Sequence, residues 1–441
     1  MAMPITNIST DTKLIHRNKT LINEINDALI LDNNVNVFQK SNYRPLTHEM
    51  RINVLNKECS TNSQLPSLAH VKRVSILNYL VFTLRSKNLF YCSVPKVATR
   101  TLLNFFTYLH IEELIAYISN SSTLQNELVK SEFARQGLLF DLQFLQKKLT
   151  LNSVTNNYNG QDTQLQVLNA FKQSLLNYSD QPDDLWHLHQ NNVLPLIKLK
   201  NINDQHTINF IHDATKVLFV RHPFNRLASA YYDKIATLRI PSAQGARNIQ
   251  VSMYDDVRRG ICRKFAQQYL NTSELTFYQQ QHPWLRHQRK INPLNDPCRT
   301  VIPTFEHFVE YILDYRSGVQ LDVHWAPYSH LCKVCTFKYD FIGKYETIAD
   351  DMQLLLKLAG ADTKEWQIKM INSNRSTVGK DDMYKKLYET LPEHLICKLQ
   401  HIYSKDVSLF NYNIEDYVDR AKLSNCRMYH QFRYHIETFS V

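Results

Sequence analysis

The stretch KVLFVRHPFNRLASAYYDK, residues 216–234, decides the fold class. Its first five residues, 216–220, are mostly apolar and β-prone, which predicts a buried strand. The turn Arg221-His222-Pro223 follows, and apolar residues then recur at helical spacing over 224–235. This part of the chain therefore predicts a strand, a short loop and a helix.

The same pattern occurs once earlier in the chain. Residues 89–94 (LFYCSV) predict a buried strand that ends at Pro95, and residues 97–110 carry apolar residues at helical spacing. Two strand–loop–helix units predict an α/β fold with a central parallel sheet flanked by helices. Ligands of such sheets bind beyond the carboxyl ends of the strands, so both loops are candidate binding loops.

The rest of the chain adds further elements. We predict a helix over 305–313, a strand entering a turn over 339–344, and an amphipathic helix over 348–361. Residues 380–441 are predicted to be mostly helical.

The domain organisation follows from composition along the chain. Residues 1–75 are polar and irregular, with a possible helix at 21–30, and we expect them to form a stem. One domain is expected over 76–425, with a helical, Asn-rich insertion at 111–185. Residues 426–441 are expected to be a tail.

The composition is that of an ordinary globular protein. Of the 441 residues, 44% are hydrophobic and 21% are charged, which excludes a mostly disordered chain. Lysine and arginine number 51 against 41 aspartates and glutamates, a formal net charge of +10. Such a charge favours an anionic partner, whether nucleic acid, nucleotide, acidic polysaccharide or membrane surface. No apolar run reaches the roughly 18–20 residues that span a bilayer, so we expect a soluble chain or an anchor outside this sequence.

Cysteines and glycosylation sequons leave the cellular compartment open. Eight cysteines are too few for a disulfide scaffold in a chain of this length. Cys332 and Cys335 form a Cys-x-x-Cys pair, without the second pair that zinc usually needs. Two interpretations fit the Asn-x-Ser/Thr glycosylation sequons: chance in an Asn-rich chain, or a secretory protein. The six sequons begin at Asn7, Asn18, Asn120, Asn177, Asn271 and Asn374.

The first loop has the chemistry of an anion site. The backbone N–H groups of a helix's first turn bind phosphate or sulfate, and Lys96 would place an ammonium beside the anion. Thr99 and Thr101 can add hydroxyl donors. The loop is not a Walker A motif, because GxxxxGK[ST] is absent. Any strand–turn–helix unit can carry Lys and Thr, so this segment alone leaves both interpretations open.

The second loop offers an arginine and a hydroxyl. Arg221 lies at a strand end, and Ser229 follows eight residues later in the predicted helix. An arginine fork and a hydroxyl can close around a second phosphate. A solvated helix with a surface arginine is the alternative. Together, the anion site of the first loop and the Arg221 and Ser229 side chains of the second predict a ligand with two anionic ends.

These segments resemble the binding motifs of sulfotransferases that use 3′-phosphoadenosine 5′-phosphosulfate (PAPS). Residues 94–101 look like the family's 5′-phosphosulfate loop, and residues 216–234 look like its 3′-phosphate motif. The resemblance is closest to the Golgi carbohydrate sulfotransferases of the HNK-1, chondroitin 4-O and dermatan 4-O group. Further blocks match that group in order: TFEHF (304–308), DVHWAP (322–327), LCKVC (331–335), YDFIGKYET (339–347) and LFNY (409–412).

The resemblance implies a P-loop-like sulfotransferase fold, PAPS as the sulfuryl donor and no metal. Lys96 would contact the bridging oxygen and offset charge as the sulfuryl group leaves, and Arg221 and Ser229 would hold the 3′-phosphate. The residues implied to bind the phosphosulfate are Pro95, Lys96, Val97, Ala98, Thr99, Arg100 and Thr101.

A general base is needed to deprotonate the acceptor hydroxyl, and the resemblance points to histidines. His189 is favoured and His187 is second, because related enzymes have a histidine in a similar place before the 3′-phosphate arginine. His324 is third, with a structural place beside Trp325 as the alternative. Glu346 is a weaker candidate that could instead orient its loop.

The first loop departs from the group, reading VPKVATRTLL where VPKVACTNWK is usual. Its Arg-Thr ending is similar to that of the uronyl 2-O-sulfotransferases. The expected reaction is sulfuryl transfer to a glycan hydroxyl, with the 4-position of GalNAc in chondroitin or dermatan favoured. A uronyl 2-O-sulfotransferase is the second enzyme hypothesis. A non-catalytic glycan-binding protein on the same fold is the hypothesis from another class.

The partners and compartment are also implied by the resemblance. We expect an acidic glycan as acceptor and PAPS or its product PAP as nucleotide, without nucleic acid. A Golgi luminal, type II membrane protein is expected, with an anchor absent from this chain. In that lumen Cys332 and Cys335 would form disulfides rather than bind zinc.

Overall fold

The structure is a computed structural model. It describes residues 46–60, 75–84, 87–119, 165–166, 168–169, 172–173, 205–238, 249–280, 296–359, 380–424 and 426. Apart from Leu46, these belong to one compact unit, Thr47–Val441, which is described here. The predicted helix at 21–30, most of the predicted insertion and the tail at 427–441 lie outside the described residues.

The core of the unit is a four-stranded sheet in the order β1-β2-β3-β4. The strands β2, β3 and β4 pair in parallel, as predicted, whereas β1 pairs antiparallel with β2. The sequence interpretation missed β1, because the polar residues 85–88 break the apolar stretch before Leu89. They lie between the two strands of this hairpin. The strands are β1 (Val81–Leu84), β2 (Leu89–Cys92), β3 (Thr215–Val220) and β4 (Phe341–Lys344).

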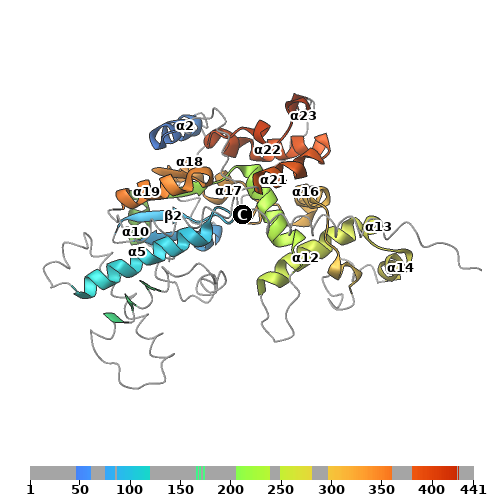
Figure 1. The fold of residues 1–441 in the computed structure, drawn as a ribbon, viewed down its shortest axis with the longest axis horizontal. Helices are drawn as coiled ribbons and strands as arrows, with labels where there is room; N and C mark the ends of the chain where they lie inside the picture. The colour runs from blue at the N-terminus through green and yellow to red at the C-terminus, as the bar shows by residue number, and fades with distance from the viewer. Residues whose placement is uncertain are drawn as a thin grey trace, which may run out of the picture. The chain divides into compact units, whose positions relative to one another are not determined.

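Two long helices, which come after β2 and β4 in the chain, cover the sheet on opposite sides (Figure 1). Figure 1 shows α5 (Thr99–Ser119) on one side of the strands and α19 (Ile348–Leu358) on the other. Helix α5 continues beyond the predicted end at residue 110, and Ile111 and Leu114 are fully buried. The start of the predicted insertion is therefore part of the core helix.

The predicted stem is wrong for residues 48–60. They form helix α2 (His48–Ser60), which packs on β4. Arg51, Leu55 and Cys59, spaced four residues apart, are its buried residues. The Arg51 guanidinium donates to Asp351 at 2.7 Å, and Cys59 forms a disulfide with Cys335. The pattern is easily missed, because one of the three anchors is charged and the helix is otherwise polar.

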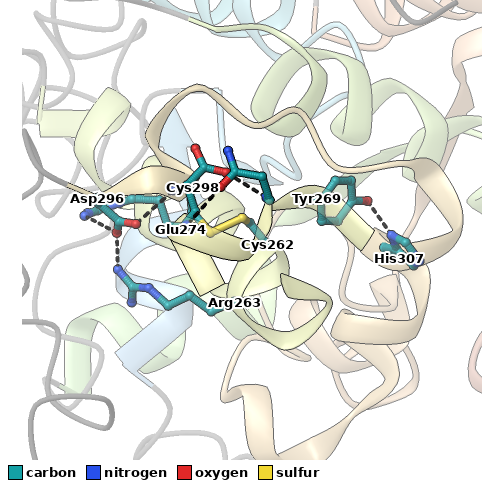
Figure 2. The surroundings of a disulfide bond; sticks show 9 residues. Cys262, Arg263, Tyr269, Glu274, Asp296, Cys298 and His307 are labelled. Atoms are coloured by element: carbon teal, nitrogen blue, oxygen red, sulfur yellow. Dashed lines mark hydrogen bonds and ion pairs between the residues drawn. A yellow bond between two sulfur atoms is a disulfide. The ribbon is translucent and has the colours of Figure 1, made fainter. Parts of the chain in front are cut away.

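All eight cysteines form disulfides, each with a partner distant in sequence: Cys59–Cys335, Cys92–Cys332, Cys262–Cys298 and Cys397–Cys426. Cys92 ends β2, so its bond to Cys332 fixes the strand just before the first candidate loop. Figure 2 shows the Cys262–Cys298 bond, which joins α12 (Ile249–Lys264) to η3 (Pro297–Thr300). Asp296, whose side chain is inaccessible to solvent, accepts from Arg263 beside this bond.

A second apolar core lies among the helices that follow β3. It contains residues of α11 (Pro223–Ala230), α16 (Phe305–Leu313) and α22 (Glu393–Leu409). The predicted helix at 305–313 and the strand within 339–344 are confirmed. The helix predicted over 224–235 is an α-helix only to Ala230 and continues as a π-helix, η1 (Tyr231–Ala236).

The remaining helices are short or peripheral: α4 (Ser75–Leu80), α10 (Gln205–Asp213), α13 (Ala266–Tyr269), α14 (Thr272–Gln280), η4 (Tyr315–Ser317), α17 (Tyr328–Leu331), α18 (Val334–Phe337), η5 (Tyr345–Thr347), α21 (Lys380–Glu389), η7 (Ile414–Asp416) and α23 (Arg420–Ser424). Within the described ranges, no helix combines the length and apolar character needed to cross a membrane.

Candidate active site

The first candidate loop, residues 93–98, joins β2 to α5. Lys96 and Ala98 have positive φ angles of 74° and 49°, which are uncommon outside glycine and cluster at functional sites. The Thr99 hydroxyl donates to the Val94 carbonyl at 2.7 Å and closes the loop. The loop therefore leads directly into the N-terminus of α5, where the N–H groups of the first turn lack hydrogen-bond partners within the helix.

The predicted binding residues of this loop have different environments. Pro95 and Val97 are buried, whereas Ala98, Thr99 and Thr101 are partly exposed at the start of α5. Arg100 also lies in the first turn of α5. An anion at this helix end would meet backbone N–H groups and the Thr101 hydroxyl, because the Thr99 hydroxyl already donates to Val94.

Two arginines of the second segment hold the first loop. Arg221, at the end of β3, donates from Nη1 to the Lys96 carbonyl at 3.2 Å. Arg226, only 1% exposed, donates from Nε to the Pro95 carbonyl at 3.2 Å. The two loops predicted from separate motifs are thus joined by hydrogen bonds, at neighbouring ends of parallel strands.

Arg226 also reaches a third segment. Its two terminal nitrogens donate to the carbonyls of Ala326 and Val323, each at 2.7 Å. These residues flank His324, so one buried guanidinium links the first loop to the segment that carries a candidate base. The sequence interpretation missed this role, although Arg226 lies within the quoted motif.

Lys96 is nearly enclosed. Its ammonium lies 3.0 Å from the Asp233 carboxylate, and its side chain is 16% exposed. Burial lowers the pKa of Lys96 to about 8, with Asp233 opposing that change and Lys234 and Arg221 adding to it. At neutral pH the ammonium is therefore mostly protonated and available to an anion.

Arg221 is buried between aromatic rings. Its guanidinium lies 4.2 Å from the centre of the Tyr345 ring and 5.7 Å from that of Tyr384. Its Nε finds no hydrogen-bond partner among the described residues. A buried donor of this kind calls for an external acceptor such as a phosphate oxygen. Ser229 lies partly buried on α11, eight residues further on.

His222 and Glu346 stabilise the second loop. The Glu346 carboxylate accepts from the His222 backbone N–H at 2.9 Å and from the Tyr412 hydroxyl at 3.0 Å. The His222 ring caps α11 and bonds to the Asn413 carbonyl. Burial lowers the pKa of His222 to about 4 and raises the pKa of Glu346. With both oxygens engaged, Glu346 has the geometry of a residue that orients the loop.

His324 lies in a buried polar cluster near Lys96. Its Nδ1 is 2.9 Å from the Asp322 carboxylate and 2.5 Å from the Tyr254 hydroxyl. Burial lowers the pKa of His324 and outweighs the opposing effect of Asp322, and the positive charges of Lys234 and Lys96 lower the pKa further. The imidazole is therefore neutral at neutral pH. The other two candidates, His187 and His189, lie outside the described residues.

Asp233, Tyr254 and Asp322 complete the site and were not singled out from sequence. Asp233 is the second-last residue of the motif quoted above, and Asp322 opens the DVHWAP block, so both lay within recognised segments. The Asp322–His324 contact is local, but the contacts of Asp233 with Lys96 and of Tyr254 with His324 join residues 137 and 70 positions apart. Motif spacing does not carry that information.

The sequence model of the sulfotransferase family matches residues 80–413, most of the chain. The chain belongs to the sulfotransferase family. Carbohydrate sulfotransferase 11 of Rattus norvegicus is 31% identical over 206 residues, 46% of this chain and 48% of the relative. The resemblance to carbohydrate sulfotransferases is thereby confirmed.

Other curated relatives carry similar names. Carbohydrate sulfotransferase 8 of Mus musculus is 30% identical over 168 residues, 38% of this chain and 32% of the relative. Carbohydrate sulfotransferase 10 of Danio rerio is 26% identical over 244 residues, 52% of this chain and 55% of the relative. The chain thus spans about half or less of the curated relatives it matches. No solved structure is significantly similar to it.

Proposed function

We propose that the protein transfers a sulfuryl group from PAPS to a sugar hydroxyl on a P-loop-like sulfotransferase fold. The observation that carries the proposal is the hydrogen bond from Arg221 to the Lys96 carbonyl. It joins two anion-binding loops at the carboxyl ends of adjacent parallel strands, where such sheets bind ligands. A nucleotide with phosphates at its 3′ and 5′ ends matches two such loops.

The 5′ end of PAPS would lie at the first loop. Lys96 and the N-terminal turn of α5 would hold the phosphosulfate, with a hydroxyl contact from Thr101 and further contacts from Pro95, Val97, Ala98, Thr99 and Arg100. In the transfer, the bond from sulfur to the bridging oxygen breaks and its electron pair stays on the 5′-phosphate of PAP. A new bond forms between sulfur and the acceptor oxygen. The Lys96 ammonium would neutralise the charge that develops on the leaving oxygen.

The 3′-phosphate would lie at the second loop. The buried Nε of Arg221 would donate to a phosphate oxygen, and Ser229 would add its hydroxyl. The Tyr345 and Tyr384 rings beside Arg221 restrict its guanidinium to one orientation. This arrangement would select a nucleotide that carries a 3′-phosphate.

The acceptor proton would pass to a histidine. His324 is the candidate that the described residues support, because Asp322 can accept from Nδ1–H and so leave Nε2 as the proton acceptor. His189 and His187 remain candidates from their place in the sequence. No step of this scheme requires a metal.

The acceptor would be an acidic glycan, with the GalNAc 4-position of chondroitin or dermatan favoured. The names of the curated relatives support a carbohydrate, and the net charge of +10 suits an acidic polymer. The proposed compartment is the Golgi lumen, since four disulfides persist in an oxidising environment. A uronyl 2-O-sulfotransferase is the second candidate because of the departure in the first loop.

The test is incubation with ³⁵S-labelled PAPS and a panel of desulfated chondroitin, dermatan, heparosan and a terminal-GalNAc glycan. Label is expected in chondroitin or dermatan, and enzymatic digestion of the product gives the position. Lys96→Ala should abolish labelling and leave glycan binding intact. Glycan binding without label in any polymer would instead favour the non-catalytic alternative.

A further inference from the structure

The helix after the second loop changes its winding next to Lys96. Helix α11 ends at Ala230, and residues Tyr231–Ala236 form the π-helix η1. Such segments are rare and often occur at functional sites. Asp233 lies in this segment, and its carboxylate accepts from Lys96 at 3.0 Å and from Lys234 at 3.1 Å.

Lys96 is fixed at both ends. Arg221 holds its carbonyl at 3.2 Å, and Asp233 holds its ammonium. Its backbone has a φ of 74°, so the loop itself is in an uncommon conformation. The ion pair with Asp233 therefore sets where the ammonium lies relative to the start of α5.

The charges that face Lys96 are mostly positive. Lys234 on η1 and Arg221 on β3 both lower the pKa of Lys96, whereas Asp233 raises it. Burial keeps the pKa of His324 lowered against the opposing effect of Asp322, and the charge of Lys96 lowers that pKa further. Asp233 is thus the anion that opposes the lowering of the Lys96 pKa by burial and by the neighbouring positive charges.

We propose that Asp233 is a positioning residue for sulfuryl transfer, which keeps Lys96 protonated and holds its ammonium beside the N-terminus of α5. The inference rests on the proposed function. Asp233 would not touch the reacting atoms. It would act through Lys96, which must carry a positive charge when the sulfur–oxygen bond breaks and the electron pair moves to the 5′-phosphate oxygen.

The experiment measures the affinity for adenosine 3′,5′-bisphosphate (PAP) by isothermal titration calorimetry between pH 6.5 and 8.5. It compares the full chain with Asp233→Asn and with the matched control Asp314→Asn, a carboxylate that pairs with Lys264 and Arg316. Removing the Asp233 charge lowers the pKa of Lys96 further, so the variant loses the positive charge at a lower pH than the wild type. The ratio of the two dissociation constants for PAP, Asp233→Asn over wild type, should then rise severalfold between pH 6.5 and 8.5. The control ratio should stay constant.

The outcomes separate this inference from the proposed function. Wild-type protein that binds no PAP would overturn both. If the wild type binds PAP but the ratio of dissociation constants for Asp233→Asn stays constant with pH, only the positioning role is overturned. A variant that merely distorts the structure weakens PAP binding equally at each pH.

A second variant covers the case in which Asp233→Asn does not fold. Lys234→Met removes one of the two lysines that pair with Asp233 and, with it, a charge that repels Lys96. The ratio of its dissociation constant for PAP to that of the wild type should therefore fall as the pH rises. A ratio that stays constant or rises would contradict the role assigned to Asp233.

Discussion

At the residue scale, the buried Arg226 and the partly exposed Asp233 carry most of the site's organisation. Arg226 donates to three carbonyls in two segments, and Asp233 pairs with the lysine of the first loop. Lys96 and Arg221 could be predicted from sequence, because strand-end residues before helices follow a local pattern. The partners that hold them could not, since hydrogen bonds to carbonyls more than 90 residues away leave no periodic signal.

Arg226→Lys is expected to destabilise the protein and the site together. Lysine carries one point charge and cannot reach three carbonyls, so buried acceptors are left without donors. The free energy of unfolding should fall by about 2–4 kcal/mol, measured by urea denaturation. Arg316→Lys is the control; its side chain is 73% exposed, and a much smaller change is expected because solvent screens its ion pair. Equal losses for the two variants would contradict the account of Arg226.

His324→Gln tests the candidate base. If His324 accepts the proton, the variant should lose about 10²–10⁴-fold in kcat and retain its PAP affinity. Wild-type activity should fall as the pH drops below the lowered pKa of His324, because only the neutral ring accepts a proton. The variant should lack this acidic limb. Unchanged kcat in His324→Gln, with loss in His189→Gln or His187→Gln, would reassign the base.

At the scale of elements, strands and helices with strong local patterns were predicted, and elements defined by tertiary contacts were not. The strands β2, β3 and β4 and helix α16 follow apolar runs or helical spacing in the sequence. The antiparallel β1 and the polar helix α2 were missed, because α2 is anchored by a buried arginine and a disulfide. The π-helix η1 was read as ordinary helix, and its winding places Asp233 at Lys96.

Removal of the Cys59–Cys335 bond tests the anchoring of α2. The cysteines are 276 residues apart in sequence, against 29 for Cys397–Cys426. Because the Cys92–Cys332 bond remains, the loop that the Cys59–Cys335 bond closes is only about 36 residues, close to the 29 of the other pair. Loop-closure entropy therefore predicts that the double serine variant at 59 and 335 loses about as much stability as the one at 397 and 426. Chemical denaturation of both variants measures the difference. A smaller loss for the 59–335 variant would contradict the interpretation that α2 is an integral part of the core.

At the scale of the whole molecule, motifs that are far apart along the chain meet at one site. The two loops, the segment that carries His324 and the block that contains Glu346 span about 250 residues of the sequence, yet hydrogen bonds connect them. Motif order predicted the family, and the family match over residues 80–413 agrees with it. The acceptor is decided by residues that motif order does not specify.

The most direct test of the central claim compares the binding of PAP and AMP by calorimetry, because AMP lacks the 3′-phosphate. Wild-type protein should prefer PAP by at least about tenfold, the contribution of a hydrogen bond to a charged group. Arg221→Met should abolish that preference, and Lys96→Met should weaken both nucleotides while keeping it. Equal affinity of the wild type for PAP and AMP, or no binding of either, would contradict a single nucleotide site built from the two loops.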